Sequence, residues 1–463
     1  MSASKITENH IKLLQNDKVI GIIGLGDMGL LYARRFSQAG WRVVACDRVE
    51  NYEFVRARFA NENFEVLRDG HLVSRISDFI IYSVEIANID KVVSLYGPSS
   101  KFGSVVGGQT SCKRPEVDAF EKYLPEDVNI ITIHSLHGPK VKTEGQPLVI
   151  IDHRSYDNGA SLRFVEAVVS CLGSKHVYLT AEEHDRITAD TQAVTHAAFL
   201  SMGSAWSKCK VYPWQTEQNK WIGGIENVKI NISLRIYSNK WHVYAGLAIT
   251  NKQAHQQILQ YATSATELYT LFLKGQREEI FERVYRAREA IFRDHNGLLL
   301  LDDSLLEEYS LSRTTPGEDN SSLVSVPSTG IGTNRTSPPN SHLSLLAIVD
   351  SWYQLGINPY DHMICSTPLF RIFLGVTEYL FLKAGLLDAT LEAGLSDKHF
   401  RRDDLEFVVA SREWSSIVSF ESFELYRRQF ETVQEFFKPK FPEATEIGNK
   451  MIEKIASHTP HGV

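Results

Sequence analysis

The chain lacks the features that would assign it to a membrane or nucleic-acid-binding class. It contains no run of about eighteen apolar residues, and the polar stretch over residues 1–17 has no apolar signal core. We therefore expect an N-terminal tail over 1–17, no targeting segment and no membrane partner. The formal net charge of −7 gives no general attraction to nucleic acid, so no nucleic-acid partner is expected either.

Cysteine is also scarce. The chain has only five cysteines, and no two of them form a Cys-x-x-Cys pair. This scatter indicates neither a zinc site nor a disulfide framework, so we expect no bound metal and a reducing, cytoplasmic environment. With 463 residues, 43% of them hydrophobic and 23% charged, the chain is long enough to form two or three ordinary globular domains.

A glycine-rich turn near the N-terminus is the first positive signal. The β-branched run over residues 19–23 leads directly into a Gly-x-Gly-x-x-Gly pattern, and residues 30–36 continue with helical spacing. A strand, a tight turn and a helix in this order are typical of dinucleotide binding, because the glycines let backbone N–H groups approach a pyrophosphate at the helix N-terminus. The cofactor-binding residues predicted here are Gly24, Leu25, Gly26, Asp27, Met28 and Gly29.

The residues after the second predicted strand bear on the choice of cofactor. This strand, over residues 41–46, ends at Asp47 and is followed by Arg48. Asp47 would accept hydrogen bonds from a ribose 2′-hydroxyl and favour NAD, whereas Arg48 could pair with a 2′-phosphate and favour NADP. Asp47 would repel that phosphate unless it turned away or was itself paired. The residues alone therefore leave both NAD and NADP open.

Short apolar strands alternate with amphipathic segments over residues 18–180, and this pattern predicts an α/β Rossmann-type domain with a mainly parallel sheet. Ligands of such sheets bind beyond the carboxyl ends of the strands, so polar residues at those ends are candidates for a site. Further strands are expected at 78–83, 104–106, 128–133, 148–151 and 176–179.

From residue 181 onward the pattern is helical, beginning with a capping box over 180–183. We expect an all-α substrate or dimerisation-type domain over 181–310 and a flexible linker rich in Ser, Thr and Pro over 311–341. A second all-α region is expected over 342–463, with one long amphipathic helix running from about 414 to 437.

The second helical region has the signs of a repeat of the first. Apolar positions agree between the two, although chance agreement is the alternative interpretation. If the repeat is real, one chain could form a monomeric pseudo-dimer with a single active site; otherwise an ordinary homodimer is expected. At a constant offset, His196, Trp206 and Pro213 are matched by His342, Trp352 and Pro359.

Two polar loops follow predicted strands and could carry chemistry. One contains Ser111, and the other begins with His134, directly after an apolar run. A histidine at the carboxyl end of a strand could accept a hydroxyl proton as a hydride leaves, and a nearby serine could fix its tautomer. Alternatively, His134 hydrogen-bonds a turn and Ser111 caps the next helix. Position alone does not separate these two interpretations.

Four segments in order resemble the prephenate dehydrogenases. They are GLGDMG at 24–29, QTSCK at 109–113, HSLHGP at 134–139, and His184-Asp185 with the later QAVTH at 192–196. The resemblance covers roughly residues 18–295, and the linker with its C-terminal extension is similar to the fungal, NADP-dependent branch.

The resemblance implies a reaction and roles for individual residues. The reaction is the oxidative decarboxylation of prephenate to 4-hydroxyphenylpyruvate in tyrosine biosynthesis, with NADP as cofactor. His134 would help remove the proton of the ring hydroxyl, Ser111 would orient this histidine and the hydroxyl, and His196 would line the substrate pocket. The family also uses an arginine of the helical domain to bind a substrate carboxylate. The candidates here are Arg235 and Lys240, or, from the C-terminal region, Arg371, Arg401 or Arg402.

Other functions stay open at this point. An arogenate dehydrogenase would differ only in its substrate. Another β-hydroxyacid-type dehydrogenase would usually use a helical-domain lysine as its acid or base, and no lysine lies in or beside residues 192–196. A catalytically silent, NADP-binding sensor is the alternative from a different class.

Overall fold

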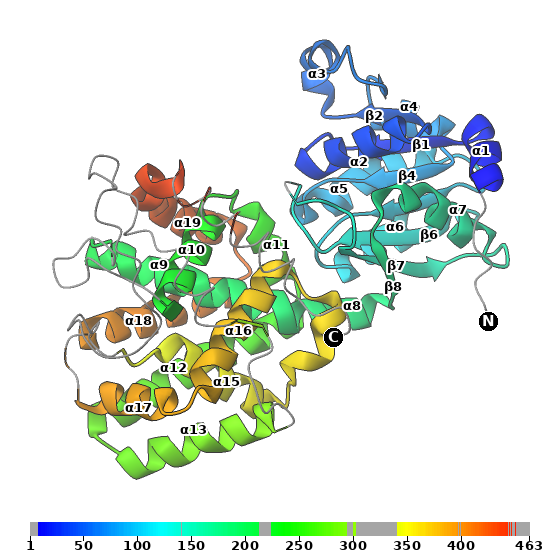
Figure 1. Ribbon diagram of the computed structural model, residues 1–463. Coiled ribbons are helices and arrows are strands. Elements are labelled where there is room, and N and C mark those ends of the chain that lie inside the picture. Colours follow the sequence, from blue (N-terminus) through cyan, green and yellow to red (C-terminus); the bar gives the residue numbers. More distant parts are fainter. Residues whose placement is uncertain are drawn as a thin grey trace, which may run out of the picture. The chain divides into compact units, whose positions relative to one another are not determined.

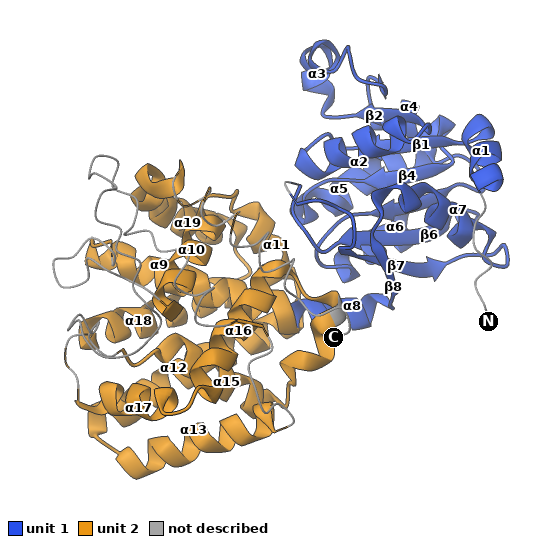
Figure 2. Ribbon diagram, in the orientation of Figure 1, with its two compact units in different colours: residues 1–189 blue, residues 190–463 orange. Residues whose placement is uncertain are grey.

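The computed structural model describes residues 8–139, 141–212, 224–293, 300–301 and 340–450, except 397, 399, 443, 445 and 447–449. The chain divides into two compact units, residues 1–189 and 190–463 (Figure 2). The division falls after the first helix that follows the sheet, whereas the sequence analysis placed the boundary at 180/181. Of the predicted linker, only residues 340 and 341 lie within the described residues.

The first unit is built on one eight-stranded sheet in the order β3-β2-β1-β4-β5-β6-β7-β8 (Figure 1). Neighbouring strands are parallel, except that β6 and β7 are antiparallel. The predicted Rossmann-type fold with a mainly parallel sheet is therefore confirmed. The strands are β1 (Val19–Ile23), β2 (Arg42–Cys46), β3 (Glu65–Val66), β4 (Phe79–Tyr82), β5 (Val105–Gly108), β6 (Asn129–Ser135), β7 (Pro147–Arg154) and β8 (Lys175–Tyr178).

Helices cover both faces of this sheet. Successive side chains of a strand point to opposite faces, so Ile20 and Ile22 of β1 pack in one apolar core, and Val19 and Ile23 pack in the other. The first core includes α2 and α7, and the second includes α5 and α6. The helices are α1 (Glu8–Asp17), α2 (Asp27–Gln38), α3 (Tyr52–Arg58), α4 (Gly70–Ile76), α5 (Ile86–Tyr96), α6 (Arg114–Tyr123), α7 (Ala160–Val169) and α8 (Ala181–Thr188).

Two expectations for this unit were wrong. The predicted N-terminal tail contains the helix α1, which forms because Ile11 and Leu14 pack against the first apolar core. Strand β6 is longer than expected, so His134 and Ser135 lie within the strand and pair with β7 instead of starting a loop.

The second unit is helical throughout its described residues, as expected from the sequence. None of the described helices is long and apolar enough to cross a membrane. A π-helix over Ala189–Ala193 leads into α9. The helices of the first half are α9 (Val194–Cys209), α10 (Gly224–Tyr237), α11 (His242–Thr250), α12 (Lys252–Lys274) and α13 (Arg277–Phe292). Those of the second half are α15 (Leu343–Leu355), α16 (Pro368–Leu382), α17 (Leu386–Ser396), α18 (Arg401–Ser419) and α19 (Phe423–Phe437), with the 3₁₀ segment η9 (Pro359–Cys365) between α15 and α16.

The two halves of this unit exchange their first helices. Helix α9 of the first half packs along α18 of the second, while α15 of the second half packs along α12 of the first. The long helices α12 and α18 pack on each other, and so do α10 and α16. The contact of α13 with α15 is matched by that of α19 with α9. This reciprocal packing is the arrangement expected if duplicated halves fold together as a dimer would.

The single amphipathic helix predicted over residues 414–437 is in fact two helices. Helix α18 ends at Ser419, and the backbone of Glu421 turns into the left-handed region with φ of 53°. The hydroxyl of Ser422 then accepts a hydrogen bond from the backbone N–H of Leu425 and caps α19. A periodic apolar pattern continued across a break that a serine cap creates.

Candidate active site

The glycine turn between β1 and α2 has the geometry of a phosphate-binding loop. The backbone of Gly24 has φ of +104°, and a side chain there or at Gly29 would collide with the carbonyl of Ser83 or of Gly24. A Cβ at Gly26, in contrast, would meet no atom within 4 Å. Gly26 also precedes the first residue of α2 without a side-chain cap. The space beside Gly26 and the N-terminus of α2 therefore suit the pyrophosphate of a dinucleotide.

The residues after β2 fit NADP. Asp47 accepts hydrogen bonds from the backbone N–H groups of Leu25 and Arg48, both at 2.8 Å. Its carboxylate is thus engaged with the backbone, which is the condition under which it would tolerate a neighbouring 2′-phosphate. The Arg48 side chain is exposed and forms no ion pair with any described residue. It is therefore available to a phosphate.

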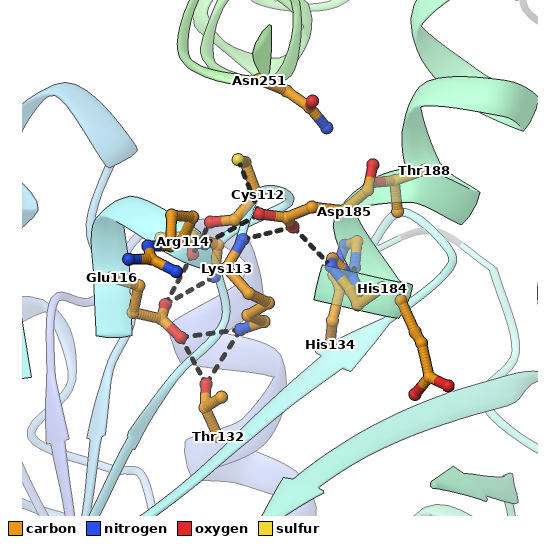
Figure 3. A network of polar contacts seen from close by, with 12 residues as sticks. Cys112, Lys113, Arg114, Glu116, Thr132, His134, His184, Asp185, Thr188 and Asn251 are labelled. Carbon is orange, nitrogen blue, oxygen red and sulfur yellow. Dashed lines mark hydrogen bonds and ion pairs between the residues drawn. The ribbon is translucent and has the colours of Figure 1, made fainter. Parts of the chain in front are cut away.

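A chain of three side chains crosses the carboxyl edge of the sheet (Figure 3). His134 on β6 is buried, and its Nδ1 lies 2.8 Å from Nε2 of His184 on α8. The Nδ1 of His184 lies 2.8 Å from Oδ1 of Asp185. The two imidazole rings meet edge to face, with centroids 5.0 Å apart. The sheet and the first helix after it thus combine to hold one histidine.

The carboxylate of Asp185 anchors this chain. It accepts hydrogen bonds from the backbone N–H groups of Lys113, at 2.6 Å, and Arg114, at 2.8 Å, at the start of α6. The thiol of Cys112 lies 3.2 Å from its second oxygen. Burial alone would raise the pKa of Asp185, but the bond to His184 and these N–H groups lower it overall. Asp185 is therefore a carboxylate, further stabilised by the positive end of α6.

The charge of Asp185 determines where the protons of both histidines lie. A carboxylate only accepts, so Nδ1 of His184 carries a proton and its Nε2 accepts the bond from Nδ1–H of His134. The Nε2 of His134 then holds a free lone pair. Burial, followed by the neighbouring His184 and Lys113, lowers the pKa of His134 well below its ordinary value. His134 is thus neutral at physiological pH and is held in the tautomer that acts as a base.

A buried lysine ties the loop to the strand beneath His134. The ammonium group of Lys113 lies 2.8 Å from Glu116, 2.9 Å from the hydroxyl of Thr132 and 2.8 Å from the carbonyl of Ile133. The side chain is fully buried, and burial lowers its pKa. Because Thr132 and Ile133 directly precede His134, these contacts fix the strand that carries the base.

The structure differs from the sequence analysis in what orients His134. Ser111, predicted to do so, is half-buried in the loop before α6, whereas Nδ1 of His134 is bonded to His184. Sequence reasoning missed His184 and Asp185 as functional residues, although both stand in the segment on which the resemblance was based. The catalytic role of Ser111 stays a prediction.

The helical unit contains a second group of predicted site residues. His196 on α9 contacts the ring of Tyr244, with centroids 4.7 Å apart. Its Nδ1 is buried without a hydrogen-bond partner, as is Nε2 of Gln192 one turn earlier. Burial lowers the pKa of His196 to about 4, so its ring is neutral. Two buried polar atoms left unpaired beside a π-helix are typical of a ligand site.

The two predicted cations of the first helical half have different surroundings. Arg235, near the end of α10, is half-buried, and Tyr244 interacts with its charge. Burial lowers the pKa of Arg235. Tyr244 also contacts His196, so Arg235 belongs to the same group of side chains as that histidine. Lys240 lies exposed in the turn between α10 and α11.

The sheet and its glycine turn place the chain among dehydrogenases that bind a nicotinamide dinucleotide. Residues 193–457 match the family model of the 6-phosphogluconate dehydrogenase C-terminal domain. The prephenate dehydrogenase [NADP(+)] of Saccharomyces cerevisiae is 64% identical over 98% of this chain and 97% of its own length. The probable prephenate dehydrogenase [NADP(+)] of Schizosaccharomyces pombe is 55% identical over 94% and 97%. The chain belongs to the prephenate dehydrogenase family.

Among solved structures, the chain is similar to prephenate dehydrogenase from A. aeolicus in complex with hydroxyphenyl propionate and NAD+. That likeness has a TM-score of 0.45 at 18% identity and covers 58% of this chain and 95% of the other.

Proposed function

We propose that this protein is an NADP-dependent prephenate dehydrogenase of tyrosine biosynthesis, acting in the cytoplasm. It converts prephenate to 4-hydroxyphenylpyruvate and CO2. The observation that carries the proposal is the chain from Asp185 through His184 to His134, which leaves an unprotonated Nε2 on a buried histidine. The two yeast relatives, similar over nearly the full length, support the same activity and cofactor.

The residues of the site divide the reaction between them. His134 accepts the proton of the ring hydroxyl at Nε2 as the carbon–oxygen bond becomes a carbonyl. When bound beside the glycine turn, NADP supplies the hydride acceptor for the same ring carbon. Loss of the ring carboxylate as CO2 returns an electron pair to the ring, and the resulting phenolate oxygen takes the proton back from His134. No net proton is released, and aromatisation makes the reaction effectively irreversible.

The role of His184 and Asp185 is electrostatic and geometric. His134 becomes positively charged when it takes the substrate proton, and the Asp185 carboxylate favours that charge through the intervening ring. Because Asp185 is already bonded to two backbone N–H groups, it needs no rearrangement during the reaction. Both residues are therefore positioning residues for the base.

Substrate binding is assigned to the helical unit. Prephenate carries two carboxylates, and a half-buried guanidinium suits such a group because it can donate two parallel hydrogen bonds. Arg235 meets this description, and His196 offers an unpaired ring nitrogen in the same group of side chains. Lys240 is the weaker candidate because it is exposed.

We also propose that the chain acts as a monomer with one active site. The reciprocal exchange of α9 and α15 gives one chain the packing of a dimer. The two matched histidines differ: Nδ1 of His196 is unpaired, whereas Nδ1 of His342 lies 3.0 Å from Glu226. Burial raises the pKa of Glu226, but His342 and Lys229 outweigh it and lower the value to about 2. The second position is therefore closed by an ion pair.

Light scattering at micromolar concentration tests the oligomeric state, and a tight dimer formed through the first helical half would contradict the monomer.

Following nicotinamide absorbance with prephenate and with arogenate, each with NADP and NAD, tests the activity. We expect turnover of prephenate with NADP and its loss in His134→Asn. A protein that binds NADP yet turns over neither substrate would instead be a sensor, and preference for arogenate would correct the substrate.

A further inference from the structure

One half-buried arginine of the second helical half has no carboxylate partner. The guanidinium of Arg371 on α16 donates to the hydroxyl of Ser366 at 2.8 Å and to the carbonyl of Met363 at 3.3 Å. No acidic side chain of the described residues forms an ion pair with it, and burial lowers its pKa. A desolvated cation without a counter-ion is costly to fold, so this position needs an explanation.

Other half-buried arginines of the same unit have their charge compensated. Arg283 is bonded to both oxygens of Asp350, each at 2.7 Å. Arg288 donates to the carbonyl of Phe381 at 2.9 Å, at the C-terminal end of α16, where the helix dipole favours a cation. Arg371 lies in the first turn of the same helix, where the dipole favours an anion instead. Its surroundings are thus electropositive and suit a bound anion.

The position of Arg371 connects it to the unpaired groups on α9. Its partner Met363 belongs to η9, and in the same segment Nε2 of His362 lies 2.9 Å from Asp190. Asp190 lies in the π-helix that also contains Gln192, one turn before His196. A ring contact between Phe199 and Phe373, with centroids 5.0 Å apart, joins the same two helices.

We infer that Arg371 binds a carboxylate of the substrate, so that the second helical half completes the site begun by the first. This inference rests on the proposed function, whose substrate is a dianion. Two half-buried guanidinium groups, those of Arg235 and Arg371, then correspond to two carboxylates. Ser366 and the Met363 carbonyl orient the guanidinium of Arg371 and leave part of its fork of donors for the ligand.

The test is the kinetics of Arg371→Gln and Arg371→Lys, with Arg288→Gln as the matched control. Removing a charge-assisted hydrogen bond should raise the KM for prephenate about 10- to 100-fold in Arg371→Gln, with a smaller change in kcat and none in the KM for NADP. Arg371→Lys should recover part of the loss, and added guanidinium ion should recover part of it in Arg371→Gln. Arg288→Gln should retain the wild-type KM for both ligands.

Inhibition by 4-hydroxyphenylpyruvate, which lacks the ring carboxylate, shows which carboxylate Arg371 binds. Weaker inhibition of Arg371→Gln assigns the side-chain carboxylate, and unchanged inhibition with a raised KM assigns the ring carboxylate. A folded Arg371→Gln with wild-type KM for prephenate would overturn the inference while leaving the proposed function intact. An inactive wild-type enzyme would overturn the proposed function itself. If Arg371→Gln melts early, Arg371→Lys decides: wild-type KM at partial charge geometry, without guanidinium rescue, rejects the inference.

Discussion

The contact between His134 and His184 allows a sharp test of how the base is held. Replacing His184 by leucine removes the acceptor for Nδ1–H of His134 but fills most of the space. His134 then loses the bond that fixes its tautomer, and Nε2 is free to carry the proton instead. Because the lost bond is backed by the Asp185 charge, its value is about 1.5–3 kcal/mol. We therefore expect kcat to fall about 10- to 100-fold.

This loss should be smaller than that of removing the base itself, which is about 10²- to 10⁴-fold for general base catalysis. The KM for NADP should stay unchanged, because the glycine turn is not altered. His184→Gln provides the rescue: its side-chain oxygen can accept the bond from His134, so it should recover most of the activity. His153→Leu, which removes a histidine that contacts Glu121 at the edge of the same sheet, should behave as wild type.

The assay is steady-state nicotinamide absorbance with prephenate and NADP, accompanied by a melting curve for each variant. The reasoning is refuted if folded His184→Leu keeps wild-type kcat, or if His184→Gln is as impaired as His184→Leu.

Three further predictions concern the cofactor site and the base. Arg48→Ala should lower the ratio of kcat/KM for NADP over NAD about 10- to 100-fold, whereas Arg42→Ala, at the other end of β2, should leave the ratio unchanged; an unchanged ratio in Arg48→Ala removes this residue from cofactor selection. Gly26→Ala should lose NADP binding, measured by fluorescence titration, at wild-type melting temperature, because its side chain meets no protein atom; a destabilised but binding-competent variant would argue against this. Because the pKa of His134 is lowered, the base stays unprotonated as pH falls through 6.5, so the acid limb of kcat/KM should lie below this value; a limb at or above it contradicts the tautomer assignment.

The fold of the first unit could be predicted because its signals are local. The glycine turn, the apolar runs and the capping box at Thr180 each depend on neighbouring residues, and the structure has all three. The helix α1 was missed because Ile11 and Leu14 are too few to give a periodic pattern, and their burial depends on a core formed by distant segments.

The site was only partly predictable for the same reason. His134 could be chosen from its place at the end of a strand, but its partner His184 is fifty residues away and becomes a neighbour only through the sheet. Ser111 was favoured as its partner because the family resemblance assigned the serine that role. The charge state that settles the tautomer comes from backbone N–H groups at the start of α6, which a sequence pattern does not reveal.

The exchange of α9 and α15 has a consequence for how such a protein can change. In a symmetric dimer each substitution occurs twice, once in every subunit, so both copies of a site must work with the same residue. With both halves in one polypeptide, one position can hold a neutral histidine open to a ligand while its counterpart is locked by an acid. His196 and His342 have diverged in this way, and fusion of the halves is what permits the difference.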